Sequence, residues 1–353
     1  MHHRPIFPFS IMISSYLCKP KVNSIQLEED RRIIGRFTGD TKGPLLICIG
    51  AMHGNEPAGV RALELIFKML EIEPLTNPDF TFNGRFLGII GNLKAFEKQQ
   101  RFINQDLNRM FSIENVDRVT NMNAEDLCAE EKELKAFVQL IRDEIADYQP
   151  EKVVLLDLHT TTAFGGIFTI TTDDDESIRI ATELNAPVVS GLLEGIQGTS
   201  MHYFNTDNIG VPTFAVAFES GQHDEHLSVN RAIAAVINCM RTIESVKAEH
   251  VENRHDALLI DFSRGLPKIA ELITAHKIKP DDNFVMKPGF KNFQKVEKGE
   301  LLADDINGPI CAEASGLLLM PLYQTQGEDG FFLIKELNDI EEHLGRVPVR
   351  VNR

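Results

Sequence analysis

Hydrophobic residues between about residue 44 and residue 246 follow two alternating patterns. Short apolar runs bounded by turn residues predict buried strands; these runs are 44–50, 85–92, 152–160, 166–172 and 213–220. Apolar residues at helical spacing predict amphipathic helices, one beginning at Pro57 and two covering 129–148 and 225–246. Strands separated by helices predict an α/β domain with a mixed, mostly parallel sheet.

The pattern changes after about residue 280, where short alternating runs are interrupted by Gly and Asp. This pattern predicts a small all-β unit in the form of a compact barrel or sandwich. The segment 256–278 has a helical pattern and is expected to link the two parts. A chain of 353 residues suggests two domains. We therefore expect an N-terminal extension over 1–30, an α/β domain over 31–279 and a β unit over 280–353.

The charge of the chain limits the partners that it can have. Lys and Arg number 36 and Asp and Glu number 52, which gives a formal net charge of −16. Nucleic acid and anionic membrane surfaces would repel such a chain, so neither is expected as a partner. A local cluster of arginines can still bind a small anion. No apolar run reaches the length of about 18 residues that a membrane span needs.

Cysteine usage and the N-terminal segment bear on the compartment. The five cysteines are odd in number and include no C-x-x-C pair, which fits neither a disulfide framework nor a thiolate zinc site. The mildly apolar N-terminal stretch lacks a basic cluster and a small-x-small cleavage site, so it is not expected to act as a signal peptide. We expect a cytoplasmic protein.

The first candidate for chemistry is the segment His53-Gly54-Asn55-Glu56, which directly follows a predicted strand and precedes a predicted helix. A His and a Glu at this spacing in a tight turn can both point at one metal ion. Imidazole nitrogen and carboxylate oxygen are ligands that suit catalytic zinc. On its own the spacing is weak evidence, because H-x-x-E also arises as an ordinary surface pair.

A second signal is Asp157-Leu158-His159 at the carboxyl end of the predicted strand 152–160, where open α/β sheets place catalytic groups. Asp157 shares a strand face with His159 and is expected to orient it as a hydrogen-bond acceptor. His159 alone would be interpreted as the polar end of a strand. Together with His53 and Glu56, it completes a set of three metal ligands.

Two further segments contain candidates for substrate binding and catalysis. The stretch 101–109 carries Arg101 and Arg109 among side-chain amides, which predicts either a clamp for a carboxylate or a solvated charged loop. Glu219 ends the apolar strand 213–220. It is either a helix-capping carboxylate or a general base whose pKa is raised by burial.

Taken in order, the motifs HGNE, R-x-x-N-x-D-L-N-R, DLH and a strand-terminal Glu resemble the succinylglutamate desuccinylase and aspartoacylase family. This family is a branch of the zinc-carboxypeptidase-like fold. The resemblance covers about residues 44–225 by motif and extends to the trailing β unit. It implies a three-layer α/β domain with a mixed, mostly parallel sheet, followed by a small all-β, barrel-like domain that caps the active site.

The resemblance also implies a metal centre and a catalytic mechanism. One zinc ion (Zn2+) per chain would be held by His53, Glu56 and His159. Glu219 would be the general base that activates water, and Arg101 would polarise the scissile carbonyl and stabilise its oxyanion.

Further residues are expected to bind the substrate or to support the metal ligands. Asn108 and Arg109 match the family's carboxylate-binding pair, and Thr160 and Tyr323 are additional candidates for substrate contact. Asp157 and Asp106 are expected to lie behind the metal ligands and support them.

Two features depart from the pattern of related proteins. Aspartoacylases carry a further substrate arginine shortly before the catalytic Glu, whereas the stretch 208–213 contains no Arg, so a second negative group on the substrate has no evident partner. The β unit also resembles a biotinyl/lipoyl barrel, yet the stretch 309–316 contains no Lys to carry a cofactor. We therefore expect the unit to cap the site.

The expected function is the zinc-dependent removal of an acyl group from an N-acyl amino acid or a similar small amide that bears a carboxylate. A metallocarboxypeptidase that acts on peptides would use the same residues. A non-catalytic zinc-binding protein is a third alternative, although a binder has no need of Glu219 and Arg101. The sequence identifies neither the acyl group nor the amino acid, and it leaves a homo-oligomer open.

Overall fold

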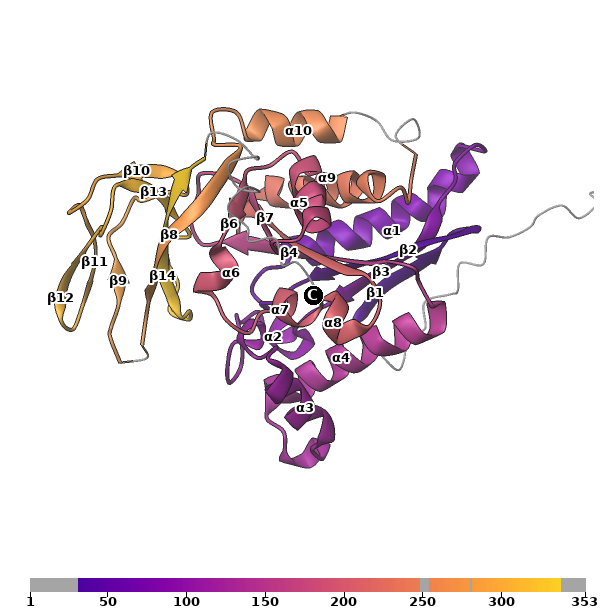
Figure 1. Ribbon diagram of the computed structural model, residues 1–353, viewed down its shortest axis with the longest axis horizontal. Coiled ribbons are helices and arrows are strands. Elements are labelled where there is room, and N and C mark those ends of the chain that lie inside the picture. Colours follow the sequence, from indigo (N-terminus) through magenta and orange to yellow (C-terminus); the bar gives the residue numbers. More distant parts are fainter. Residues whose placement is uncertain (1–30, 248–253, 280, 338–353) are drawn as a thin grey trace, which may run out of the picture.

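The computed structural model describes residues 31–247, 254–279 and 281–337, so the expected extension over 1–30 lies outside the described residues (Figure 1). Most of its strands join one large sheet in the order β1-β3-β2-β4-β7-β5-β6-β8-β14-β13-β10. Their bounds are β1 Ile33–Thr38, β2 Thr41–Gly50, β3 Asn83–Ile90, β4 Val153–Thr161, β5 Phe168–Thr171, β6 Val188–Ser190, β7 Thr213–Gln222, β8 Ile269–Lys277, β10 Gln294–Val296, β13 Gly316–Leu319 and β14 Asp329–Glu336.

The centre of this sheet is parallel and fully covered. Strands β3, β2, β4 and β7 pair in parallel, while β1 and β5 run antiparallel to their neighbours β3 and β7. All nine residues of β4 are buried, which explains why this strand is a continuous apolar run in the sequence. The predicted class, an α/β fold with a mixed and mostly parallel sheet, is confirmed for this part of the chain.

Helices cover both faces of the sheet (Figure 1). They are α1 Ala58–Thr76, α2 Leu93–Lys98, α3 Ile113–Asn121, α4 Ala129–Tyr148, α5 Asp175–Glu183, α6 Leu192–Gly195, α7 Ser200–Tyr203, α8 Thr206–Ile209, α9 His226–Thr242 and α10 Arg254–Phe262, with 3-10 turns at Leu107–Arg109 and Ala124–Asp126. None of the helices in the described ranges combines the length and apolar composition needed to cross a membrane.

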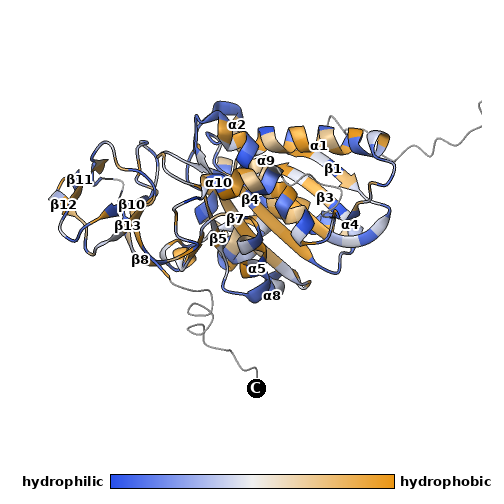
Figure 2. Cartoon of the chain, turned by 90° about the horizontal axis from the view of Figure 1, so that it is seen from above, coloured by the Kyte–Doolittle hydropathy of each residue, from blue (hydrophilic) through white to orange (hydrophobic). Residues whose placement is uncertain are grey.

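Strand alternation divides the hydrophobic core into two layers. Leu45 and Ile47 of β2 pack with Phe137 of α4 on one face, while Leu46 packs with Leu63 of α1 on the other. Figure 2 shows the hydrophobic residues concentrated along the central strands, between the helices that cover them. The result is the expected three-layer arrangement.

The segment 256–278 is not a single helix, so this prediction is wrong. Helix α10 ends before Gly265, which has a φ of +82°, and before Pro267. Strand β8 follows and pairs with β6 on one side and with β14 on the other. These tertiary pairings override the helical pattern of the segment.

The strands after residue 280 are antiparallel, as expected of an all-β unit, but they belong to two sheets. Strands β10, β13 and β14 extend the large sheet through β8, whereas β9 Val285–Met286, β11 Leu301–Asp305 and β12 Gly308–Cys311 form a three-stranded sheet. Together they enclose a small core of their own, which includes Met286, Leu302 and Leu318. Strand β8, which precedes residue 280, pairs with β6 on one side and with β14 on the other, so the unit is continuous with the large sheet.

Candidate active site

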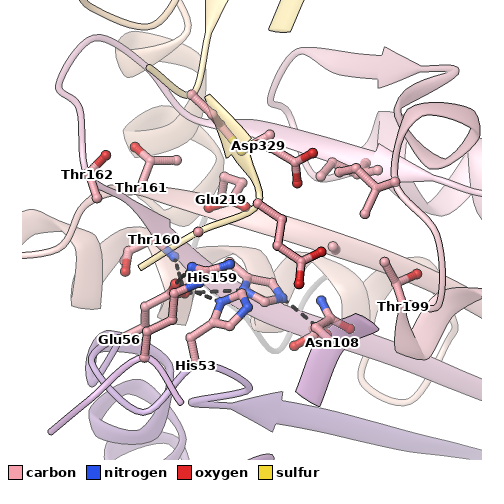
Figure 3. A pocket seen from close by; sticks show the side chains of 18 of the residues that line it. His53, Glu56, Asn108, His159, Thr160, Thr161, Thr162, Thr199, Glu219 and Asp329 are labelled. Carbon is pink, nitrogen blue, oxygen red and sulfur yellow. Dashed lines mark hydrogen bonds and ion pairs between the residues drawn. The ribbon is translucent and has the colours of Figure 1, made fainter. Parts of the chain in front are cut away.

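Three buried polar side chains, His53, Glu56 and His159, meet at the carboxyl ends of β2 and β4 (Figure 3). The Nδ1 atom of His53 lies 2.9 Å from Oε1 of Glu56, and Nδ1 of His159 lies 3.2 Å from Oε2 of the same carboxylate. Ligand atoms of the three residues all lie within 4.8 Å of one another. Two imidazoles and a carboxylate at this separation form a donor set that suits zinc.

The turn between β2 and α1 places His53 and Glu56. It is closed by a hydrogen bond of 3.1 Å from the Glu56 N–H to the His53 carbonyl. Gly54 passes so close to α2 that a Cβ atom there would lie 2.1 Å from the carbonyl carbon of Ala95, so a larger residue does not fit. The N–H of Gly54 donates to the carbonyl of Arg101 at 3.1 Å, which ties the arginine segment to the same turn.

Each histidine uses its second ring nitrogen to contact a buried carboxylate. Nε2 of His53 lies 3.3 Å from Oδ1 of Asp106, and Nε2 of His159 lies 3.1 Å from Oδ2 of Asp157. A histidine that donates its Nε2–H to a carboxylate leaves the Nδ1 lone pair free, which is the tautomer that a metal ligand requires. Asp106 and Asp157 therefore lie where a supporting role would place them.

The charges of the cluster favour an ionised Glu56. Burial opposes its ionisation, but the charge of His53 and the hydrogen bond from His159 hold the pKa of Glu56 well below its usual range. Burial likewise opposes protonation of His159, but Asp157 and Glu56 raise the pKa of this histidine well above its usual value. Glu56 is therefore available as the carboxylate that a metal would need, whereas a metal at Nδ1 of His159 would replace the proton that the raised pKa favours there.

Glu219 lies on β7, where the parallel register places it opposite His159 on β4. Its side chain points into the pocket, and its Oε2 atom is buried with no hydrogen-bond partner among the described residues (Figure 3). Burial raises the pKa of Glu219 to about 7. A carboxyl group with a pKa near neutrality and a free oxygen can accept a proton and return it.

Arg101 lies beside the metal-ligand cluster. Its Nη2 atom is 2.9 Å from Oδ2 of Asp106, and its Nη1 atom is 3.6 Å from Oε1 of Glu56. Its Nε atom is buried and has no hydrogen-bond partner among the described residues. This buried, unused donor on a cation makes Arg101 available to a negatively charged group in the pocket.

Asn108 and Arg109 line the same pocket. The carboxamide oxygen of Asn108 accepts a hydrogen bond of 2.9 Å from the N–H of Ser200. Arg109 donates through Nη1 to the carbonyl of Asn108 at 2.8 Å and lies 2.7 Å through Nη2 from Oδ2 of Asp329. Its Nε atom, like that of Arg101, is buried with no hydrogen-bond partner among the described residues, although it lies 3.8 Å from Oε2 of Glu328.

Thr160 lines the pocket, and Tyr323 does not. The N–H of Thr160 donates to Oε2 of Glu56 at 3.0 Å. Tyr323 is exposed, and its hydroxyl donates to the carbonyl of Lys287 and accepts from the N–H of Phe290, both at 2.9 Å. The structure therefore brings Thr160 to the site and leaves Tyr323 outside it.

Several residues that line the pocket are not predicted from the sequence, and His223 and Asp329 are two polar examples. His223 follows Glu219 by four residues, and its Nδ1 atom lies 2.7 Å from the Thr160 hydroxyl. Its nearness to Glu219 in the sequence is the signal that could have identified it. Asp329 reaches the pocket from the C-terminal unit, and no local pattern around it indicates this position.

Fold and site together define a mixed α/β protein with a candidate metal centre at the carboxyl ends of its central strands. A sequence model of the family described as the succinylglutamate desuccinylase/aspartoacylase catalytic domain matches residues 42–243. This match extends over more than half of the chain, which therefore belongs to this family. The two activities in the family name are hydrolyses of an amide bond in an acylated amino acid.

Relatives of known name agree with this assignment. The chain is 32% identical over 127 residues to a probable aspartoacylase from Nostoc sp., an alignment that spans 36% of this chain and 38% of the relative. It is 24% identical over 279 residues to a succinylglutamate desuccinylase from Pseudoalteromonas atlantica, which spans 77% of this chain and 75% of that protein. The chain thus spans less than half of the aspartoacylase and three quarters of the desuccinylase.

Solved structures share the fold. A succinylglutamate desuccinylase from Vibrio cholerae superposes with a TM-score of 0.59 at 17% identity, over 85% of this chain and 83% of that one. A murine aminoacylase 3 variant superposes with a TM-score of 0.55 at 16% identity, over 83% of this chain and 94% of that one. At these identities the likeness concerns the fold alone.

Proposed function

We propose that this protein is a zinc-dependent deacylase that hydrolyses the amide bond of an N-acyl amino acid or a similar small amide bearing a carboxylate. The observation that carries the proposal is the buried, unpartnered carboxyl oxygen of Glu219 next to the His53–Glu56–His159 cluster. A protein that only bound zinc would gain nothing from such a group, because burying an unsatisfied carboxyl oxygen destabilises the fold.

The residues present fit a zinc ion. His53, Glu56 and His159 would hold it through Nδ1, a carboxylate oxygen and Nδ1, with Asp106 and Asp157 orienting the two imidazoles. When bound, zinc supplies a Lewis acid that lowers the pKa of water from about 15.7 toward 7.

Other side chains of the pocket would transfer the proton, stabilise the oxyanion and bind the substrate carboxylate. Glu219 takes the proton of the attacking water and later gives it to the leaving amine. Arg101 faces the charge that develops on the carbonyl oxygen, a contribution commonly worth about 3 kcal/mol for one donor. Arg109 and Asn108 hold the carboxylate of the substrate, and the Nε–H of Arg109, which has no hydrogen-bond partner among the described residues, is one donor for it.

The size of the pocket favours a small substrate over a peptide. Its cavity volume is about 110 Å³. The C-terminal unit restricts it, because Gln324 and Asp329 of that unit line the pocket together with the catalytic face of the large sheet. A peptide would need an open groove for the residues that precede its last one.

The test compares Glu219→Gln with the wild type, both loaded with zinc, on a panel of N-acyl amino acids, by measuring the free amine released. We expect Glu219→Gln to retain zinc and to lower kcat by roughly 100-fold or more, because the amide cannot accept the proton. Glu144→Gln is the matched control, since Glu144 is a buried carboxylate of α4 that pairs with Arg36 far from the pocket. Near-normal turnover in Glu219→Gln would exclude the proposed mechanism.

A further inference from the structure

One side of the pocket is lined by apolar side chains, which we call the apolar wall. Its members come from β5, from α6 and the residue after it, from α7, from β7 and from β14. They are Ile170, Leu193, Ile196, Met201, Ala217 and Phe332.

The register of the sheet places the apolar wall next to the proposed base. Ala217 and Glu219 are two residues apart on β7, so their side chains point to the same face. Ala217 is the direct cross-strand partner of Ile170 on β5 and, on its other side, of Asp157 on β4. The apolar wall therefore begins on the β5 side of Glu219, while the metal-ligand cluster lies on the β4 side.

Helix α6 completes the apolar wall against the C-terminal unit. A Cβ atom on Gly195 would lie 3.0 Å from Leu272 of β8 and 3.9 Å from Phe332 of β14, so α6 packs directly onto these strands. Leu193 of α6 and Ile196, the residue after α6, line the same pocket. Thr199, between Ile196 and Met201, adds a polar side chain to this part of the lining, and its hydroxyl already contacts Nδ1 of His202 at 2.7 Å.

The cations of the pocket are too few for two carboxylates on a substrate. Among the described lining residues the only Lys or Arg side chains are Arg101 and Arg109. Arg101 lies by the metal-ligand cluster with Asp106, and Arg109, which also pairs with Asp329, is the cation proposed above for the first carboxylate. A second carboxylate directed at the apolar wall would lose its hydration, find no cation and lie near the negative charge of Asp329.

We propose that the substrate of this protein carries a single carboxylate, bound at Arg109, and an uncharged apolar group that packs against the apolar wall. The proposal rests on the deacylase function proposed above and specifies its substrate class. A substrate of this class differs from the dicarboxylic amino acids, aspartate and glutamate, that appear in the names of the relatives.

The test uses pairs of amides in which an apolar group replaces a carboxylate of the same shape. N-acetyl-leucine and N-acetylaspartate form the pair for the amino-acid end, and 4-methylpentanoyl-alanine and succinyl-alanine form the pair for the acyl end. We expect the apolar member of at least one pair to exceed its acidic partner in kcat/KM by roughly 100-fold. Equal or higher kcat/KM for the acidic member of both pairs would overturn the proposal.

A positive charge placed on the apolar wall should weaken the preference for the apolar substrate. Leu193 is half-buried at the pocket, so Leu193→Arg adds a cation without filling the core, and we expect the apolar-to-acidic ratio of kcat/KM to fall at least 10-fold. Leu65→Arg on the exposed face of α1 is the matched control and should leave the ratio unchanged. If Leu193→Arg behaves like this control, the apolar wall does not contact the substrate.

Binding separates this proposal from the deacylase function. Calorimetric titration of zinc-loaded Glu219→Gln with N-acetyl-leucine and N-acetylaspartate measures affinity without turnover. Tighter binding of N-acetyl-leucine by Glu219→Gln, together with no hydrolysis of any of the amides by the zinc-loaded wild type, would support the apolar wall and refute the deacylase function. Hydrolysis with a preference for the acidic members would support the deacylase function and refute the apolar wall, and binding of neither ligand would refute both.

Discussion

Arg101 and Arg109 lie in one short segment but meet different surroundings. Arg101 lies 3.6 Å from the carboxylate of Glu56, within the metal-ligand cluster. Arg109 points toward β14 and pairs with Asp329 at 2.7 Å. The two guanidinium groups therefore serve different parts of one pocket, although in the sequence they form a single motif.

This difference predicts distinct kinetic effects. Arg101→Ala should lower kcat by about 100-fold or more with less effect on KM, because Arg101 meets charge that appears only in the transition state. Arg109→Ala should chiefly raise KM, because the substrate carboxylate is charged in both the ground state and the transition state. Steady-state kinetics of both variants on one N-acyl amino acid decides the matter. The opposite pattern would mean that the two roles are exchanged.

The metal ligands give a second prediction at the same scale. His159→Ala should lose most of the bound zinc, measured by elemental analysis at one equivalent per chain in the wild type, because it removes one of three protein ligands. His276→Ala should retain the zinc, since His276 stacks on Phe331 in the C-terminal unit, away from the cluster. Full occupancy in His159→Ala would contradict the assigned ligands.

At the scale of the elements, the short turn between β2 and α1 positions two of the three proposed metal ligands, His53 and Glu56. Gly54→Ala should lower the free energy of unfolding by about 1–3 kcal/mol and weaken zinc binding, because its Cβ would collide with the backbone of α2. Urea unfolding and a zinc titration measure the two effects. Asn55→Ala changes the neighbouring residue and removes only a hydrogen bond of 3.0 Å to Gln324, so it should retain zinc. Normal zinc affinity in Gly54→Ala would show that the turn tolerates displacement.

The elements that the sequence predicted well are those whose own residues determine them. Strand β4 is apolar along its length because both faces are buried, and α4 covers the predicted range 129–148. Strand β8 was missed, because its partners β6 and β14 are distant in the sequence. Thr160 follows the predicted ligand His159 directly in the sequence, and it lines the pocket as expected. The position of Tyr323 depends instead on how the C-terminal unit packs, which local sequence does not determine.

At the scale of the whole molecule, the C-terminal unit contributes to the pocket as well as to the fold. The large sheet runs without interruption from β1 to β10, so the unit is attached through β8 and β14. Asp329, at the start of β14, pairs with Arg109, and Phe332 on the same strand belongs to the apolar wall. Motifs of the first 220 residues indicate the proposed chemistry, but the side of the pocket that we propose to select the substrate includes Phe332 of β14.

The excess of carboxylates predicts how the stability of the whole molecule depends on pH. Hydrogen bonds and ion pairs lower the pKa of several surface carboxylates in the folded state, which are Glu97, Glu131, Asp147, Glu176 and Glu225. For Glu176, the hydrogen bond from Arg179 and the contact with Lys152 lower the pKa from 4.5 to about 2. A pKa that is lower in the folded state stabilises the protein above the unfolded value, and this stabilisation is lost as the pH falls from about 4.5 toward 2.

Glu176→Gln isolates this effect. Because Arg179 is 45% exposed and water screens the pair, we expect the substitution to lower the free energy of unfolding by only about 0.5 kcal/mol at pH 7. The difference from the wild type, measured by urea unfolding, should shrink as the pH falls below about 4.5, since the wild-type carboxylate then becomes protonated in the unfolded state. It should also shrink in about 1 M salt, which screens exposed charges. Glu64→Gln, at an exposed position of α1, is the matched control for the loss of a surface carboxylate. A difference for Glu176→Gln that is the same at pH 7 and at pH 3 would show that the side chain acts through packing and not through its charge.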